Sequence, residues 1–316
     1  MNIGWVGVHA EGIAALQAVC EADYDVVGFM TLKPQMADRR CGSADYDTIC
    51  DRFSIPVFEV DHVNDSSSLT ILQTWDCDLL VVLGWGQILN AAALKTARLG
   101  VVGAHASLLP HNRGSAPVNW AIIHGEPTTG NSLIWLEEDV DAGGLIDQRS
   151  FPVSPYDTCS TIYDRVAESN AEMLLKLLSR LELGEFPGRP QPESAERLLP
   201  RRRPEDGQIH WDKPAIEIYN LIRAVTRPYP GARTVLHGRQ VHVWKAALLP
   251  TFSQSAKPGT VLGPVMSPVE EACGIMVATV DGAIVLLEVE DTHGRILNGR
   301  DLCEDAATHM RLHYAA

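Results

Sequence analysis

The sequence is short of basic residues. Its 26 Lys and Arg stand against 40 Asp and Glu, which gives a formal net charge of -14 at pH 7. Nucleic-acid surfaces are built from Lys and Arg side chains that neutralise phosphates, so this balance argues against a nucleic-acid partner. The one locally basic run is Arg201-Arg202-Arg203.

Paired cysteines and long apolar segments are missing as well. The seven cysteines include no C-x-x-C pair and no Cys/His spacing suited to zinc, so we expect reduced thiols and no metal. The first residues, M-N-I-G-W-V-G-V, contain no basic segment and lead directly into a predicted strand. We therefore expect no signal peptide, no membrane span and a cytoplasmic protein.

The apolar content is sufficient for two folded domains, since 46% of the 316 residues are hydrophobic. Residues 1–185 alternate strand and helix patterns and predict an α/β domain with a Rossmann-like, mostly parallel sheet. Residues 186–204 are rich in Pro and Arg and predict an interdomain linker. Short alternating strands over 205–316 predict a small, OB-like β-barrel domain.

The expected strands follow from the periodicity of the apolar residues. The chain opens with a βαβ pattern, but the turn from Gly7 to Gly12 is neither a G-x-G-x-x-G fingerprint nor a phosphate loop, so we expect no dinucleotide or NTP site there. A helical period over 157–184 predicts one long helix. The expected strands are 3–8, 26–31, 55–58, 79–83, 101–102, 132–136, 209–211, 234–236, 241–244, 275–278 and 283–287.

A histidine stands where one of these strands ends. The strand at 101–102 stops at Gly103, and His105 and Ser107 follow. In an open α/β sheet, ligands gather at the carboxyl ends of the strands, so His105 is a candidate site residue by position. The alternative interpretation is a loop histidine that hydrogen-bonds a backbone carbonyl.

Two further loops follow predicted strands. In Gly84-Trp85-Gly86-Gln87, two glycines around an aromatic residue would let the backbone approach a flat ligand; the alternative is a tight turn in which Trp85 packs. Asp139 and Asp141 lie on an acidic loop of the kind that is usually solvated. The glycines after Asp141 give that carboxylate room to turn inward.

Together these motifs resemble the folate-dependent formyltransferase family. The matching motifs are H-A-S-L-L-P from His105, the R-G-x-A-P that follows it and V-D-A-G around Asp141. The resemblance implies 10-formyltetrahydrofolate as co-substrate without a metal, and a catalytic pair. In this pair we expect His105 to donate to the oxyanion and to carry a proton, and Asp141 to orient His105 and favour its protonated form. The implied folate-binding residues are Gly84, Trp85, Gly86, Gln87, Ile88, Asp139 and Val140, and the implied substrate-binding residues are Ser107, Leu108, Pro110, Arg113 and Gly114.

The chain departs from the family at one central position. The family's catalytic asparagine stands two residues before the histidine, where this chain has Gly103, which has no side chain to hydrogen-bond the formyl oxygen. The stretches N-W-A-I-I-H-G and I-W-L-E-E-D-V-D are also similar to the hydrolase domain of 10-formyltetrahydrofolate dehydrogenase. Gly103 therefore leaves open whether catalysis is kept, redirected or lost.

The resemblance predicts transfer of a formyl group to an amine. R-R-P-E-D-G-Q-I-H-W and I-R-A-V-T-R-P-Y-P-G-A are similar to the methionyl-tRNA and sugar formyltransferases. Because the acidic charge disfavours tRNA, we expect a small-molecule amine, in particular an amino sugar carried on a nucleotide. The alternatives are hydrolysis of 10-formyltetrahydrofolate to formate, formylation of methionyl-tRNA, and folate binding without turnover. Homodimerisation stays open.

Overall fold

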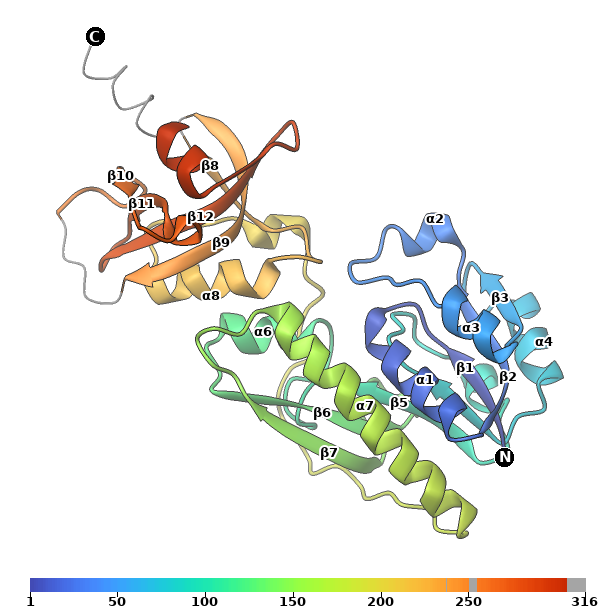
Figure 1. Ribbon diagram of the computed structural model, residues 1–316. Helices are drawn as coiled ribbons and strands as arrows, with labels where there is room; N and C mark the ends of the chain where they lie inside the picture. The colour runs from blue at the N-terminus through green and yellow to red at the C-terminus, as the bar shows by residue number, and fades with distance from the viewer. Residues whose placement is uncertain (237, 250–254, 306–316) are drawn as a thin grey trace. The chain divides into compact units, whose positions relative to one another are not determined.

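The computed structural model describes residues 1–236, 238–249 and 255–305, and the chain divides into two compact units (Figure 1). Unit 1 comprises Met1–Val118, Pro127–Val153 and Thr161–Arg201. Unit 2 begins its main part at Arg202 and also includes Asn119–Glu126 and Ser154–Ser160. Most of the segment expected to be a linker, up to Arg201, thus belongs to unit 1.

Unit 1 is built on a seven-stranded sheet with the strand order β3-β2-β1-β4-β5-β6-β7. The first five strands pair in parallel, and β6 and β7 are antiparallel to their neighbours. This confirms the prediction of a mostly parallel α/β sheet. The strands are β1 (Asn2–Val6), β2 (Asp25–Leu32), β3 (Val57–Val60), β4 (Leu79–Val82), β5 (Gly100–His105), β6 (Thr128–Trp135) and β7 (Leu145–Pro152).

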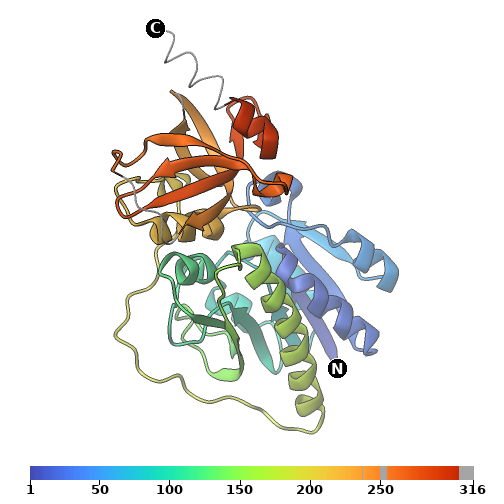
Figure 2. The ribbon, with the colours of Figure 1, turned by 60° about the vertical axis from the view of Figure 1, so that its left-hand side comes forward.

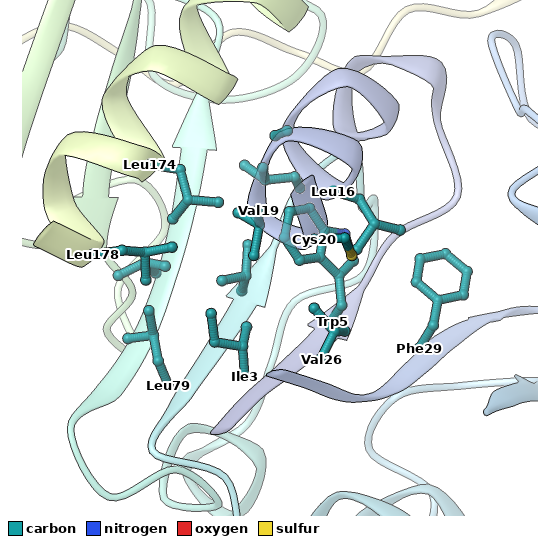
Figure 3. Packing of buried hydrophobic residues seen from close by; sticks show 14 of the residues in the cluster. Ile3, Trp5, Leu16, Val19, Cys20, Val26, Phe29, Leu79, Leu174 and Leu178 are labelled. Carbon is teal, nitrogen blue, oxygen red and sulfur yellow. The ribbon is translucent and has the colours of Figure 1, made fainter. Parts of the chain in front are cut away.

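Helices cover both faces of this sheet, because its central strands are apolar on both sides. Leu79 and Val81 of β4 face the cluster under α1 (Ile13–Glu21) and α7 (Cys159–Glu182), as Figure 3 shows for Leu79. Leu80 and Val82 belong to the opposite cluster, with Leu72 and Ala93. The remaining helices of the first 153 residues are η1 (Ala10–Gly12), α2 (Pro34–Ala37), α3 (Asp47–Phe53), α4 (Ser66–Thr74), α5 (Ala91–Leu94) and α6 (Pro117–Ile123).

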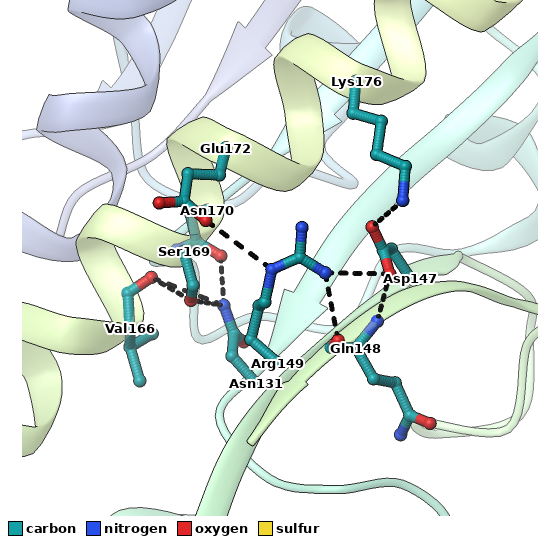
Figure 4. A network of polar contacts seen from close by, with 9 residues as sticks. All are labelled: Asn131, Asp147, Gln148, Arg149, Val166, Ser169, Asn170, Glu172 and Lys176. Carbon is teal, nitrogen blue, oxygen red and sulfur yellow. Dashed lines mark hydrogen bonds and ion pairs between the residues drawn. The ribbon is translucent and has the colours of Figure 1, made fainter. Parts of the chain in front are cut away.

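A polar network, buried at Asn131 and exposed at Lys176, joins α7 to the antiparallel part of the sheet (Figure 4). The Asn131 amide on β6 donates to Asn170 Oδ1 at 2.6 Å and to Ser169 Oγ at 2.9 Å. On β7, Asp147 pairs with Lys176 at 2.9 Å. Since buried polar groups are costly to leave unpaired, these bonds fix the position of α7 along β6 and β7.

Unit 2 carries an antiparallel sheet with the order β10-β11-β12-β9-β8, and β13 pairs with β12. A small, OB-like β domain was predicted here, and the second domain is indeed all-β around this sheet apart from its helices, whereas β10 and β13 were not among the predicted strands. The prediction of a strand over 209–211 was wrong, because this segment only donates the Ile209 N–H to Arg233 O at 2.8 Å. The elements are η2 (Pro204–Gly207), α8 (Ala215–Val225), β8 (Ala232–Leu236), β9 (Arg239–Leu249), β10 (Val261–Val265), η3 (Glu270–Ala272), β11 (Gly274–Ala278), β12 (Ala283–Asp291) and β13 (Ile296–Asn298).

Two short segments from the first half of the chain are part of unit 2 because α8 binds them. The fully buried Asn119 donates its amide to Ala224 O, across 105 residues of sequence. The Arg223 guanidinium donates to Ser154 O at 3.0 Å and to Asp157 O at 2.7 Å. Over the described residues, no helix is long and apolar enough to cross a membrane.

Candidate active site

His105 is the last residue of β5, and its ring lies at the carboxyl edge of the parallel strands with 8% of its surface exposed. The ring Nε2 lies 2.8 Å from the backbone oxygen of Asn112. A carbonyl oxygen can only accept, so Nε2 carries the proton of the neutral ring. The other nitrogen, Nδ1, lies 3.4 Å from Asp141 Oδ1. The ring is therefore held on one side and faces a carboxylate on the other.

The structure brings Asp141 beside His105, although the two residues come from different loops. Asp141 follows β6 and adopts the left-handed backbone conformation with φ of 53°. Its Oδ2 accepts the backbone N–H of Gly114 at 2.9 Å, which leaves Oδ1 directed at the histidine. A left-handed non-glycine residue is costly and persists where its surroundings hold it. The predicted pair is thus placed within contact distance.

The space beside Gly103 is filled by the side chain of Leu136. Gly103 is buried in β5, two residues before His105 and on the same face of the sheet. A Cβ added there would lie 2.8 Å from Cδ2 and 3.0 Å from Cδ1 of Leu136. Leu136 thus occupies the space that a side chain at position 103 would enter.

The predicted substrate-binding residues divide into two groups. Ser107 and Leu108 are held within unit 1: the Ser107 hydroxyl donates to His111 O at 2.6 Å, and Leu108 packs over Gly130 of β6. Pro110, in a cis peptide bond, is half-buried. Arg113 and Gly114 lie next to the His105–Asp141 pair, since Gly114 binds Asp141 and Arg113 follows Asn112 directly.

The loop after β4 is rigidly supported. Gly84, at φ of 64°, accepts the N–H groups of Val8 and His9 on its carbonyl. The Gln87 side chain accepts from Val63 N at 2.8 Å and donates to Asp61 O at 3.0 Å. Trp85 packs against the apolar cluster on the α4 face of the sheet. Gln87 and Trp85 thus support the loop, and their contact with folate stays a prediction.

Two open grooves border the predicted folate-binding residues. One has a volume of about 590 Å³ and is lined by Gly86, Gln87 and the 64% exposed Ile88, together with Arg40 and His62. The other has a volume of about 530 Å³ and is lined by Leu94, Glu137, Glu138 and Asp139. Val140, beside Asp139, exposes 37% of its surface. The exposed apolar side chains offer contacts for a flat ligand.

Two titratable groups beside Gly84 have shifted pKa values. Burial and the nearby Arg40 lower the pKa of His9 to about 4, and burial raises the pKa of Glu11 to about 7. Both residues follow β1, and a Cβ on Gly84 would lie 3.0 Å from His9 Cβ and 3.2 Å from Glu11 Cγ. Such shifts concentrate at functional sites. In the sequence, His9 and Glu11 carry no signal of this kind, because the shifts depend on burial.

The loops that carry Arg113 and Asp141 are joined by a segment that was not predicted to belong to the site. Residues 187–199, here called the strap, run without a helix or strand after the end of α7 (Figure 2). The Gln191 side chain binds Arg113 and the backbone of the Asp141 loop. Glu196 pairs with His111 at 2.9 Å, and Leu199 exchanges backbone hydrogen bonds with Arg113 and Ser115. Its Pro-rich composition carried no signal for these contacts.

Sequence comparisons identify both halves of the chain. Residues 12–178 match the formyl transferase family, and residues 202–306 match the formyl transferase C-terminal domain. A methionyl-tRNA formyltransferase of Symbiobacterium thermophilum is 34% identical over 93% of this chain and 89% of its own length. Another, of Pelotomaculum thermopropionicum, is 31% identical over 95% of this chain and 94% of its own length.

Solved structures share the fold. HypX from Aquifex aeolicus in complex with tetrahydrofolic acid has a TM-score of 0.65 and 20% identity over 94% of this chain, which spans about half the length of HypX, 45%. An N-formyltransferase from Helicobacter canadensis, in complex with folinic acid and dTDP-3-aminofucose, has a TM-score of 0.62 and 17% identity over 90% of this chain and 98% of its own. With two matching domains and a relative at 34% identity over 93% of this sequence, the chain belongs to the formyl transferase family.

Proposed function

We propose that this folate-dependent formyltransferase transfers the formyl group of 10-formyltetrahydrofolate to an amino group on a small molecule, in particular an amino sugar carried on a nucleotide. The observation that carries the proposal is the His105–Asp141 pair at the carboxyl edge of the sheet, with Nδ1 and Oδ1 3.4 Å apart. A proton acceptor at this edge is what the attacking amine requires, because an ammonium must lose a proton before it is nucleophilic.

In the proposed mechanism, the amine attacks the formyl carbon, and the bond from that carbon to the folate nitrogen breaks as the oxyanion collapses. His105 takes the proton of the attacking amine on Nδ1 and passes it to the departing folate nitrogen. The hydrogen bond from Nε2 to the Asn112 carbonyl keeps Nε2 protonated, so Nδ1 is the basic atom of the neutral ring. Asp141 then stabilises the imidazolium that forms, while Gly114 N holds the carboxylate in place. This proposal assigns the proton-carrying role expected of His105 to its Nδ1 atom.

The negative charge that develops on the formyl oxygen needs a donor or a positive charge nearby. At position 103 the family's amide donor is replaced by glycine, and the apolar Leu136 fills the adjoining space. We propose that the protonated His105 ring supplies the positive charge instead. The ring is 8% exposed, and burial strengthens such an interaction because water screens it less.

The residues around the β4 loop are suited to folate. Exposed Ile88 lines a groove of about 590 Å³ beside Gly86, which lacks a side chain that would block a flat ring. When bound, the co-substrate supplies the activated formyl group. We propose that Ile88 and Val140 contact its apolar surface and that the backbone of residues 84–86 lies against its ring.

The choice of acceptor rests on charge. The curated relatives at 34% and 31% identity are methionyl-tRNA formyltransferases, which favours methionyl-tRNA as the second candidate. Residues 202–306, however, contain eleven Lys and Arg against thirteen Asp and Glu, so the matched C-terminal domain has no excess of positive charge for a tRNA backbone. The dTDP-amino sugar bound by the Helicobacter canadensis relative supports the sugar class.

Parallel assays with 10-formyltetrahydrofolate test the acceptor. The protein is incubated with a panel of nucleotide-linked amino sugars, with charged initiator tRNA, and with no acceptor, and each formylated product is detected by mass spectrometry or gel shift. We expect a formylated amino sugar. A formylated tRNA, with every sugar untouched, would replace the proposal with the tRNA activity. Folate turnover that yields no formylated amine at all would reject amine transfer.

Hydrolysis is a third candidate, and the Gly103–Leu136 arrangement favours it. Without the amide donor, the site departs from the arrangement that the family uses for amine transfer, and water can take the place of the amine as nucleophile. Formate release without an acceptor measures this activity, with His105→Ala as the reference variant. Release no faster than in His105→Ala excludes hydrolysis, and folate affinity without either activity indicates a binding protein.

A further inference from the structure

Gln191 on the strap is bound on both ends of its side-chain amide. Its Nε2 donates to the backbone oxygens of Asp141 and Gly143, each at 2.8 Å. Its Oε1 accepts from Arg113 Nη2 at 2.7 Å and from Arg113 Nε at 3.3 Å. One half-buried amide therefore joins the loop after β5, the loop after β6 and the strap.

The residues that Gln191 binds adjoin both partners of the catalytic histidine. Asn112, whose carbonyl holds His105 Nε2, is the chain neighbour of Arg113. Asp141, which faces His105 Nδ1, is held by Gln191 through its own backbone oxygen. The backbone of Asp141 is left-handed, with φ of 53°, so it needs support from outside the loop.

We propose that Gln191 is a positioning residue for formyl transfer: it fixes the Asp141 carboxylate and the Asn112 carbonyl on either side of His105. Both ends of the amide are needed. The N–H groups hold the Asp141 loop, and the oxygen holds Arg113. This inference rests on the proposed role of the His105–Asp141 pair, but its structural part concerns only the ring of His105 and its two partners.

Three variants separate the ends of the amide from the strap as a whole. Gln191→Met keeps the length of the side chain and removes both ends. Gln191→Glu keeps an acceptor for Arg113 and places a carboxylate where the two backbone oxygens need a donor. Trp135→Phe is the matched control, since it removes another bond to the strap, from Trp135 Nε1 to Pro187 O at 2.7 Å, without touching Asp141 or Arg113.

The first readout is kinetic, in whichever formyl-transfer or formate-release assay the protein supports. We expect Gln191→Met and Gln191→Glu to lower kcat on the order of tenfold to a hundredfold, with KM for 10-formyltetrahydrofolate changed less than about threefold, because a misplaced catalytic pair affects the chemical step. Trp135→Phe keeps the wild-type kcat. Equal losses in Trp135→Phe and Gln191→Met would overturn the proposal, because the effect would then belong to the strap in general.

The second readout does not depend on activity. Protein labelled with ¹⁵N-histidine reports the Nε2-bound proton of His105, which is protected from exchange with water by its bond to the Asn112 carbonyl. We expect this proton to exchange faster in both Gln191 variants than in the wild type and Trp135→Phe. Unchanged exchange in both Gln191 variants overturns the proposal, even if the protein proves inactive toward every amine. Should Gln191→Met fail to fold, Gln191→Glu carries both readouts.

Discussion

A Cβ on Gly103 would lie 2.8 Å from Cδ2 of Leu136. The glycine and the leucine are therefore linked: an amide at position 103 and a leucine at 136 compete for one space. An asparagine at position 103 would need space that Leu136 fills, so we expect restoration of the amide to require a change at both positions.

The contact between Gly103 and Leu136 predicts how substitutions at these positions change stability and turnover. We expect Gly103→Asn alone to destabilise the protein by about 1–3 kcal/mol, because it overpacks a buried strand. Gly103→Asn with Leu136→Ala regains part of this stability and raises amine-transfer turnover about tenfold or more over Leu136→Ala alone, because an oxyanion donor has been added. Thermal unfolding and product formation measure the two effects. Additive losses in the double variant would contradict the competition for space.

A second prediction concerns the proposed catalytic pair, His105 and Asp141. His105→Ala and Asp141→Asn each lower turnover on the order of a hundredfold or more, because proton transfer loses its acceptor or the group that stabilises it. Asp141→Asn also tests the orientation, since its amide still accepts the Gly114 N–H while the charge facing Nδ1 is gone. Circular dichroism checks that both variants fold. Wild-type turnover in Asp141→Asn would refute the pairing.

The strap lies directly against Gly114, which binds Asp141. A Cβ there would lie 2.6 Å from the backbone N and O of Leu199, and φ is 109°. We expect Gly114→Ala to cost about 1–3 kcal/mol through strain and displacement of the strap, and to reduce turnover. Gly184→Ala is the control, because Gly184 also has a positive φ of 77° but no atom within 4 Å of the added Cβ. Equal effects of the two variants on turnover would argue against a link between strap and site.

Glu11 predicts a pH dependence of stability. Burial raises its pKa to about 7 in the folded protein, so the folded state binds the proton more tightly than the unfolded state, where the pKa is 4.5. The stability contributed by the protonated form is complete below about pH 4.5 and is lost as the pH rises through 7. Glu11→Gln should therefore be more stable than the wild type at pH 8, by up to about 3 kcal/mol, with the gap narrowing at low pH. A pH-independent gap would contradict this.

Sequence patterns predicted the parts of the fold that depend on local periodicity. β4 was predicted because it is apolar throughout, and α7 because its apolar residues recur at helical spacing. β7 was missed, since its residues L-I-D-Q-R-S-F-P are mostly polar and half-buried at an edge of the sheet. The segment 209–211 has a strand-like composition, but only one of its backbone groups finds a partner in the sheet.

The same distinction applies to the site. His105 and Asp141 were predicted because a motif surrounds each of them. Gln191 could not be predicted, since its side-chain amide binds groups 48 to 78 residues away in the sequence. Gln191 also lies in a stretch whose composition is that of a linker. The role of Leu136 could not be predicted either, because it depends on the volume that its side chain fills beside Gly103.

The hydrogen bond from Asn119 to Ala224 affects the order in which the chain can fold during its synthesis. During synthesis, residues 119–126 and 154–160 leave the ribosome well before α8 does. Asn119 therefore cannot form its hydrogen bond until its acceptor, 105 residues later, has been made. Closing so long a loop costs entropy and slows assembly. Unit 2 therefore completes only after most of the chain has emerged, and a fragment that ends at Arg201 leaves the fully buried amide of Asn119 without its acceptor.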